Sequence, residues 1–167
     1  MSWSILIERG NLGFSAAHFI TFDGECEPLH GHNYGVRVEA AGELTSDSYV
    51  FDFVTLKNIV RALCKEWDHR FLLPLRSPHL RVNQRDDQWD IAYGENIRYS
   101  FPTSAVVTLS TDNATAERLA QLLAGRIHEA LRARGIGQSL TLLRVGIEET
   151  EMQTAFYTLD LHESGDG

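Results

Sequence analysis

Hydrophobic and polar positions alternate along several short stretches of the chain, which is the pattern of half-buried β-strands. The clearest stretch is 33–43, where every second residue, from Tyr34 to Ala40, is apolar. Shorter stretches of the same kind predict strands over 4–8, 14–18, 105–109, 140–149 and 153–161.

Two longer stretches have the spacing of a helix with one buried face. One helix is expected over 55–67, with Asp52 as a candidate N-cap, and the other over 114–134, where Gly135 ends it. The order of elements is strands, helix, hairpin, helix, strands. This order predicts an α+β fold with an antiparallel sheet, and residues 1–167 are expected to form a single domain.

The stretch from about 75 to 104 has the least regular pattern. Pro74 and Pro78 open a polar segment that we interpret as a loop. Residues 89–93 and 97–101 are then typical of two strands of a β-hairpin joined at 94–96.

Composition and charge exclude several classes of function. The chain of 167 residues has a net charge of −8, which argues against nucleic-acid binding because such binding requires a basic face. It also lacks an apolar run of about 18 residues that could span a membrane. The first five residues do not have the charged head and apolar stretch of a signal peptide, so we expect a cytoplasmic protein.

Three histidines form the most specific chemical pattern. His30 and His32 flank Gly31, and residues i and i+2 of an extended chain point to one face, so their imidazoles project side by side. His18 ends a neighbouring strand. Three imidazoles with one open position are typical of a catalytic zinc site. For His18 alone, an ordinary polar role in a sheet is the alternative.

Several other side chains are candidates for chemistry. Cys26 lies in a polar loop shortly before the His-Gly-His, where a cytosolic thiol is more often catalytic or metal-linked than disulfide-bonded. Asp68 precedes His69 and could orient its ring as a proton carrier, although a solvated helix end is the alternative. Glu149 continues an apolar row, so its carboxylate should meet a hydrogen-bonding partner. Glu148 points the other way and is expected to be solvated.

These residues belong to a series of motifs that resembles the 6-pyruvoyltetrahydropterin synthase family. In chain order the motifs are Phe14-Ser-Ala-Ala-His18, Cys26-Glu-Pro-Leu-His30-Gly-His32-Asn-Tyr, Phe51-Asp-Phe-Val-Thr-Leu-Lys57, Trp67-Asp-His-Arg-Phe71, Asn113-Ala-Thr-Ala-Glu117 and Ile147-Glu-Glu-Thr150. The family includes 6-carboxytetrahydropterin synthase of the queuosine pathway. The resemblance implies a T-fold, in which a four-stranded antiparallel sheet carries two helices on one face. The hairpin within 75–104 would then be an insertion.

The resemblance also implies an activity and a set of site residues. The reaction would be a lyase reaction that eliminates triphosphate from 7,8-dihydroneopterin triphosphate, giving 6-pyruvoyl-tetrahydropterin. In the branch that gives 6-carboxy-tetrahydropterin, two carbons also leave as acetaldehyde. The enzyme would be a homohexamer of two stacked trimers with its sites between subunits. The implied residues are the Zn²⁺ ligands His18, His30 and His32, the catalytic thiol and its relay partners Cys26, Asp68 and His69, and the substrate-binding residues Glu149, Thr115 and Glu117. Ala114 stands where the family usually has Pro or Ser.

Glu27 leaves a second reaction open. One branch of the family lacks the cysteine and uses a glutamate three residues before the His-Gly-His. That branch cleaves dihydroneopterin-type side chains to 6-hydroxymethyl-dihydropterin, a folate precursor. This chain has both Cys26 and Glu27 at the two spacings, and Glu27 is otherwise a solvated loop acid. A non-catalytic zinc- or pterin-binding homologue and a generic metal-dependent hydrolase are further alternatives. The sequence does not decide between the queuosine, biopterin and folate pathways.

Overall fold

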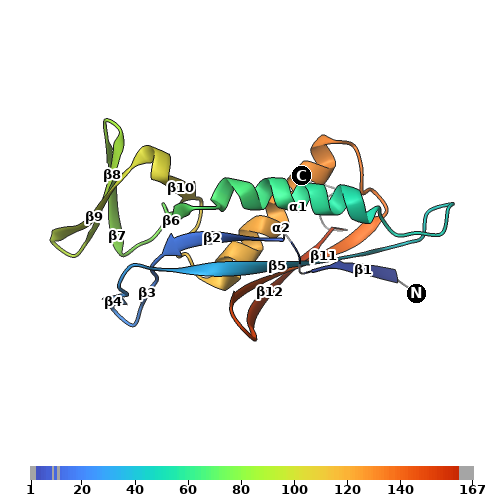
Figure 1. Cartoon of the computed structure of the whole chain (residues 1–167), viewed down its shortest axis with the longest axis horizontal. Coiled ribbons are helices and arrows are strands. Elements are labelled where there is room, and N and C mark those ends of the chain that lie inside the picture. The colour runs from blue at the N-terminus through green and yellow to red at the C-terminus, as the bar shows by residue number, and fades with distance from the viewer. Residues whose placement is uncertain (1–2, 9, 11, 162–167) are drawn as a thin grey trace.

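A computed structural model describes residues 3–8, 10 and 12–161 of the chain. Its main sheet has seven strands, in the order β10-β6-β2-β5-β11-β12, with β1 paired to the second half of β5 (Figure 1). The strands are β1 (Trp3–Ile7), β2 (Gly13–His18), β5 (His30–Gly42), β6 (Arg70–Pro74), β10 (Val106–Leu109), β11 (Leu140–Thr150) and β12 (Gln153–Asp160).

Two helices, α1 (Phe53–Trp67) and α2 (Ala116–Ala133), cover one face of this sheet. Asp52 caps α1 as predicted, because its carboxylate accepts a hydrogen bond from the Thr55 backbone N–H at 2.6 Å. The apolar faces of both helices share one core with the inward side chains of the strands, including Leu56, Leu63, Leu119, Ile127, Val38 and Val145. The expected α+β class is therefore confirmed. Neither helix in the described part of the chain is long and apolar enough to cross a membrane.

The sheet is mixed, so the expectation of a purely antiparallel sheet was wrong. β6 runs parallel to both β2 and β10, whereas the remaining pairs are antiparallel. Only Asp68 and His69 separate α1 from β6. α1 runs back along β5, and β6 continues in that direction beside β2 (Figure 1).

A separate antiparallel sheet at one end of the molecule contains β7 (Leu80–Arg85), β8 (Gln88–Tyr93) and β9 (Asn96–Pro102) (Figure 1). We expected a loop followed by a single hairpin, and β7 was therefore missed. Its alternation is limited to Leu80 and Val82, and the rest of the strand is polar and exposed, so the pattern is too short to predict a strand. A 3₁₀ turn (Thr103–Ala105) leads from β9 into β10. That this segment is an insertion in the family fold stays a prediction.

A second, smaller core joins this outer sheet to the main sheet. Its buried members are Phe19, Cys26, Phe71, Leu73, Ile91 and Val106. Beside it lies a short hairpin of β3 (Thr21–Phe22) and β4 (Glu25–Cys26), within the segment that links β2 to β5.

Candidate functional site

Strand pairing places the three histidines together. His18, the last residue of β2, pairs with His30, the first residue of β5, and His32 pairs with Ala16. All three side chains lie on the helix-covered face, where one nitrogen from each lies within 4.8 Å of the others. A Cβ on Gly31 would be 3.0 Å from the Ala16 carbonyl oxygen, so a glycine suits this close strand contact. The predicted clustering is confirmed.

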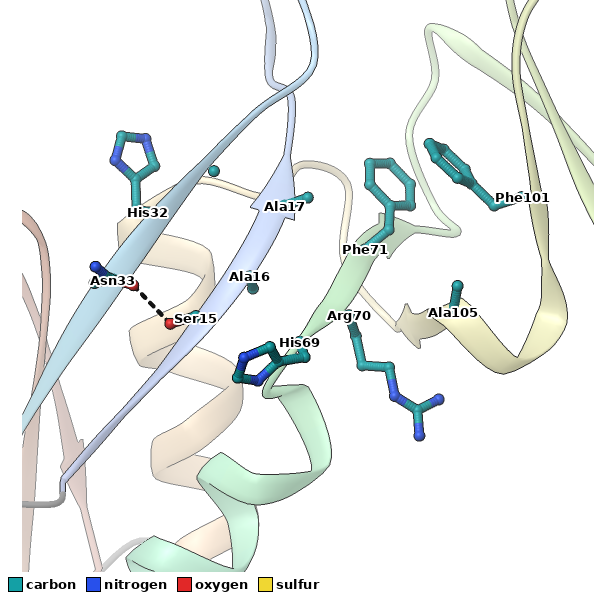
Figure 2. A pocket seen from close by; sticks show the side chains of 11 residues that line it. Ser15, Ala16, Ala17, His32, Asn33, His69, Arg70, Phe71, Phe101 and Ala105 are labelled. Atoms are coloured by element: carbon teal, nitrogen blue, oxygen red, sulfur yellow. Dashed lines mark hydrogen bonds between the residues drawn. The ribbon is translucent and has the colours of Figure 1, made fainter.

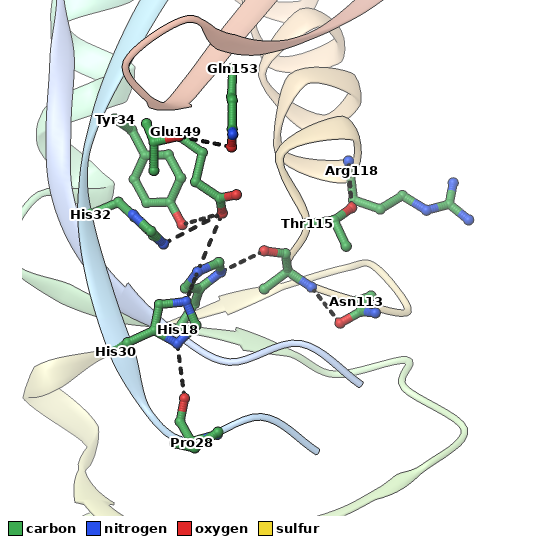
Figure 3. A network of polar contacts seen from close by, with 12 residues as sticks. His18, Pro28, His30, His32, Tyr34, Asn113, Thr115, Arg118, Glu149 and Gln153 are labelled. Carbon is green, nitrogen blue, oxygen red and sulfur yellow. Dashed lines mark hydrogen bonds and ion pairs between the residues drawn. The ribbon is translucent and has the colours of Figure 1, made fainter. Parts of the chain in front are cut away.

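Backbone carbonyls determine which nitrogen of two rings is available (Figure 3). Nδ1 of His18 lies 2.8 Å from the carbonyl oxygen of Ala114, and Nδ1 of His30 lies 2.9 Å from that of Pro28. Because a carbonyl oxygen only accepts, each neutral ring carries its proton on Nδ1 and keeps a lone pair on Nε2. The two Nε2 atoms are 3.1 Å apart. Oε1 of Glu149 is 3.4 Å from Nε2 of His18, so electron-rich atoms converge where a cation would stabilise them.

Burial keeps His18 in the neutral form that metals bind. The residue is only 1% exposed. This desolvation lowers its pKa, an effect that the Ala114 carbonyl and the charge of Glu149 partly oppose. His30 and His32 lower the pKa further because two imidazolium charges would repel.

The carboxylate of Glu149 has the hydrogen-bonding partners that we expected, because this residue continues an apolar row of its strand. The Tyr34 hydroxyl donates to its Oε1 at 3.4 Å, and Nε2 of His32 lies 3.8 Å from the same atom (Figure 3). Burial, together with the charge of Glu149, raises the pKa of Tyr34, so the phenol remains a donor. The neighbouring Glu148 is not merely solvated as expected, since it forms an ion pair with Arg37 at 2.6 Å.

A cavity of about 570 Å³ opens beside Glu149 and is also lined by Thr115 and Glu117. Thr115 is the N-cap of α2, and its hydroxyl accepts a hydrogen bond from the Arg118 backbone N–H at 3.4 Å. Glu117 lies in the first turn of the same helix. The structure therefore brings together the three residues that the sequence assigned to substrate binding, in a volume typical of small-molecule sites.

Cys26 is placed in the second apolar core. The residue is 8% exposed, and its Sγ lies 3.7 Å from the Glu27 carbonyl oxygen. Burial raises the pKa of the thiol, Arg98 partly offsets this, and the charge of Glu27 adds to it. Within this chain the thiol is thus less acidic than a free cysteine, whereas reactive cysteines have a lowered pKa.

Asp68 and His69 form the predicted pair but face away from the histidine cluster. The Asp68 carboxylate accepts hydrogen bonds from the Ser15 N–H at 2.8 Å and from Nδ1 of His69 at 2.9 Å. The Ser15 N–H lowers the pKa of this carboxyl group. His69 lines a cavity of about 500 Å³ with Ser15, His32 and Asn33, and Figure 2 shows the His32 ring pointing away from His69. No hydrogen bond or ion pair among the described residues connects this pair to Cys26.

Comparison with known proteins now identifies the family. The family model described as 6-pyruvoyl tetrahydropterin synthase matches residues 9–160. The chain belongs to this family. The resemblance inferred from the motifs is therefore confirmed.

Individual relatives agree with this membership. A Methanocaldococcus jannaschii protein assigned as a 6-carboxy-5,6,7,8-tetrahydropterin synthase is 36% identical over 150 residues, which span 89% of this chain and 91% of that protein. A structure of Plasmodium vivax 6-pyruvoyltetrahydropterin synthase, with a catalytic glutamate replaced by alanine, matches with a TM-score of 0.90 and 31% identity, covering 96% of this chain and 99% of that one. A Pyrococcus furiosus dihydroneopterin monophosphate aldolase is 44% identical over 59 residues, or 35% of this chain and 50% of that protein.

Asn113 is a site residue to which the sequence assigned no role beyond a family motif. Its Oδ1 accepts hydrogen bonds from the N–H groups of Ala114 at 3.0 Å and Thr21 at 3.3 Å, and its Nδ2 donates to the Thr21 carbonyl at 2.8 Å. It thereby joins the residue that orients His18 to the segment that carries Cys26. Membership in the Asn-Ala-Thr-Ala-Glu motif was the only sequence signal for it.

Proposed function

We propose that this chain is a zinc-dependent lyase that eliminates triphosphate from 7,8-dihydroneopterin triphosphate. It would form 6-pyruvoyl-tetrahydropterin, or 6-carboxy-tetrahydropterin where two side-chain carbons also leave as acetaldehyde. One observation carries the proposal. Three imidazoles and a carboxylate converge beside a cavity of about 570 Å³, in a chain of the tetrahydropterin synthase family. Relatives named for each of the two products match over most of this chain.

The histidine cluster suits Zn²⁺, which His18, His30 and His32 would hold through their Nε2 atoms. Neutral imidazoles are ordinary zinc ligands, and a carbonyl partner on Nδ1 is the usual way to fix the ring and its tautomer. Three ligands leave a position for substrate. When bound, zinc supplies a Lewis acid that polarises the hydroxyl groups of the substrate side chain and acidifies the neighbouring C–H bond.

Glu149 would bind the pterin ring in the adjoining cavity. A carboxylate can accept two parallel hydrogen bonds, here from the ring amino group and the neighbouring N–H. Its Oε1 contacts His18 and Tyr34, so ring binding requires that these contacts be exchanged for contacts with the ring. Thr115 and Glu117 would contact the ring from another wall of the cavity.

Cys26 would move protons on the substrate side chain, with Asp68 and His69 as relay partners from another copy of the chain. The separation of the relay pair from the histidine cluster supports this arrangement, as does the sheet, which ends in β12 and leaves β1 paired on one side only. Edge-to-edge association would pair these exposed edges, in a homohexamer of two stacked trimers. An imidazolium brought next to Cys26 would lower the pKa of the thiol.

A second reaction, side-chain cleavage to 6-hydroxymethyl-dihydropterin with Glu27 as the base, is favoured by specific observations. Cys26 is buried and its pKa is raised, while Glu27 is adjacent and more exposed. The Plasmodium vivax relative has a catalytic glutamate, and the Pyrococcus furiosus relative is named as an aldolase.

Product analysis separates these functions. We expect the zinc-loaded protein to release triphosphate from dihydroneopterin triphosphate and to form a tetrahydropterin, identified by chromatography and mass spectrometry. 6-Hydroxymethyl-dihydropterin as the sole product would establish the second reaction instead. Binding of the substrate without turnover would identify a non-catalytic homologue.

A further inference from the structure

The segment that carries Cys26 and Glu27 has little stability of its own. Strands β3 and β4 have two residues each. The turn between them, at Asp23 and Gly24, has positive φ angles of 49° and 78°, as in a type I′ hairpin. Even a much longer two-stranded hairpin is only marginally stable in water. Contacts from outside the segment must therefore fix its position.

Two tyrosines of the outer β7-β8-β9 sheet supply such contacts. The Tyr99 hydroxyl accepts a hydrogen bond from the Leu29 backbone N–H at 3.0 Å, next to His30. The Tyr93 hydroxyl donates to the carbonyl oxygen of Gly24, at the tip of the hairpin. The outer sheet thus holds the segment at its tip, Gly24, and at its end, Leu29. Asn113 holds the start of the segment at Thr21.

Stacking contacts fix the position of the Tyr99 ring in addition to its hydrogen bond with Leu29. The ring stacks on Phe19 with centroids 5.4 Å apart and on Phe101 with centroids 5.9 Å apart. Phe19 belongs to the same small core as Cys26. Because these aromatic rings pack between the two sheets, the outer sheet determines where the hydroxyl group meets the segment.

We propose that Tyr93 and Tyr99 are positioning residues, which hold Cys26 and Glu27 in place relative to the histidine cluster through the backbone of Gly24 and Leu29. The inference rests on the proposed function, in which one of these two side chains is the base. Through these two tyrosines, the outer β7-β8-β9 sheet would contribute to turnover. A misplaced catalytic group can cost about 100-fold in rate for a shift of about 1 Å, so loss of such contacts has a measurable effect.

The neighbouring Arg98 adds an electrostatic reason why the position of this segment matters. It precedes Tyr99 on β9, and its charge lowers the pKa of the Cys26 thiol against the effect of burial. A segment that moves away from the outer sheet would lose this effect together with the hydrogen bonds.

The test removes single oxygen atoms and keeps the aromatic rings. Tyr99→Phe, Tyr93→Phe and the double variant are compared with Tyr49→Phe, an exposed tyrosine that lines a different cavity with Trp3. With the zinc-loaded enzyme we expect kcat to fall about threefold to tenfold for Tyr99→Phe, and further for the double variant, since each loses one hydrogen bond. KM and zinc content should stay unchanged, because neither tyrosine contacts Glu149 or the histidines. Tyr49→Phe should behave as the wild type.

A second measurement tests the contacts without turnover. The alkylation rate of Cys26 by iodoacetamide, mapped by mass spectrometry with the buried Cys64 as an internal reference, should rise at least about threefold in the double variant. If the wild type forms no pterin product, the proposed function fails and this rate still decides the positioning role. An alkylation rate of Cys26 in the double variant equal to that in the wild type would overturn the inference. A raised KM with unchanged kcat would also overturn it.

Discussion

At the scale of single residues, two carbonyl oxygens determine the chemistry of the histidine cluster. By accepting from Nδ1, the carbonyls of Ala114 and Pro28 direct the lone pairs of His18 and His30 toward each other, and Nε2 of His18 also lies beside Glu149. Neither carbonyl is visible in the sequence as a functional group. The alternation in β5 predicted where the imidazoles lie, and the tertiary contacts decided which nitrogen each one offers.

Replacement of His18 should remove the metal. We expect about one zinc per chain in the purified wild type, and His18→Ala should lose most of it, because two imidazoles bind zinc far more weakly than three. His128→Ala, a histidine of α2 far from the cluster in the sequence, is the matched control. Atomic absorption or mass spectrometry under native conditions measures occupancy, which should fall in acidic buffer because zinc binds only deprotonated imidazoles. Full occupancy in His18→Ala would contradict the assignment.

The adjacent Cys26 and Glu27 should respond differently to substitution. If Cys26 is the working base, Cys26→Ala should lower synthase turnover by about 10²–10⁴, the usual contribution of a positioned base. Glu27→Gln should leave the synthase reaction nearly intact and abolish any side-chain cleavage. Substrate binding should change little in both variants because Glu149 and the histidines remain.

Steady-state kinetics with product identification distinguishes the two residues. Unchanged synthase turnover in Cys26→Ala would refute the thiol as the base and make cleavage by Glu27 the leading reaction.

At the scale of elements, the N-terminus of α2 combines a structural and a functional position. Thr115 caps the helix and also lines the cavity beside Glu149. Just before it, Asn113 and Ala114 connect this helix end to His18 and to the segment that carries Cys26. Displacement of this single helix end would therefore disturb the proposed metal ligands, the cavity and the proposed base together.

The capping role of Thr115 can be measured separately from substrate binding. Thr115→Ala should lower the free energy of unfolding by about 1 kcal/mol, the typical contribution of an N-cap hydroxyl. Thr115→Ser retains the accepting oxygen and should unfold like the wild type. Urea denaturation followed by circular dichroism measures both variants. Equal stability of Thr115→Ala and the wild type would mean that the 3.4 Å contact contributes nothing.

At the scale of the whole molecule, the two faces of the main sheet present different halves of the expected catalytic set. The helix-covered face holds the histidines and Glu149, whereas His69 lines a cavity with Ser15 and Asn33, on strand positions that point to the other face. In the proposed mechanism, one chain provides parts of two sites and a second copy of the chain completes each of them. This is the physical argument for the proposed assembly.

A mixing experiment tests whether sites are shared between chains. Glu149→Ala and His69→Ala should each be nearly inactive alone, yet denatured and refolded together at equal amounts they should recover about a quarter of the wild-type activity, since one site in four then combines two intact residues. Light scattering should show a closed oligomer, expected to be a hexamer. Absence of recovery in correctly assembled mixtures would place both residues in the same chain, and an active monomer would exclude assembly altogether.

The sequence by itself determined the helices and strands in which apolar residues recur at regular spacing. It also determined which side chains share one face of each of these elements. The stripes of α1 and α2, the alternation of β5 and the shared face of His30 and His32 follow from local spacing, because periodicity reports which side of an element is buried. The order of motifs determined the family.

Only the tertiary structure decided which elements become neighbours. No local period reports the parallel pairing of β6 or the position of Cys26 among apolar side chains. The alternation in β7 covers only its first four residues. The decisive contacts join residues far apart in the chain, 96 positions for His18 and Ala114 and 70 for Tyr99 and Leu29. Such contacts depend on how sheets and helices pack in space, and the spacing of residues along one element does not encode that packing.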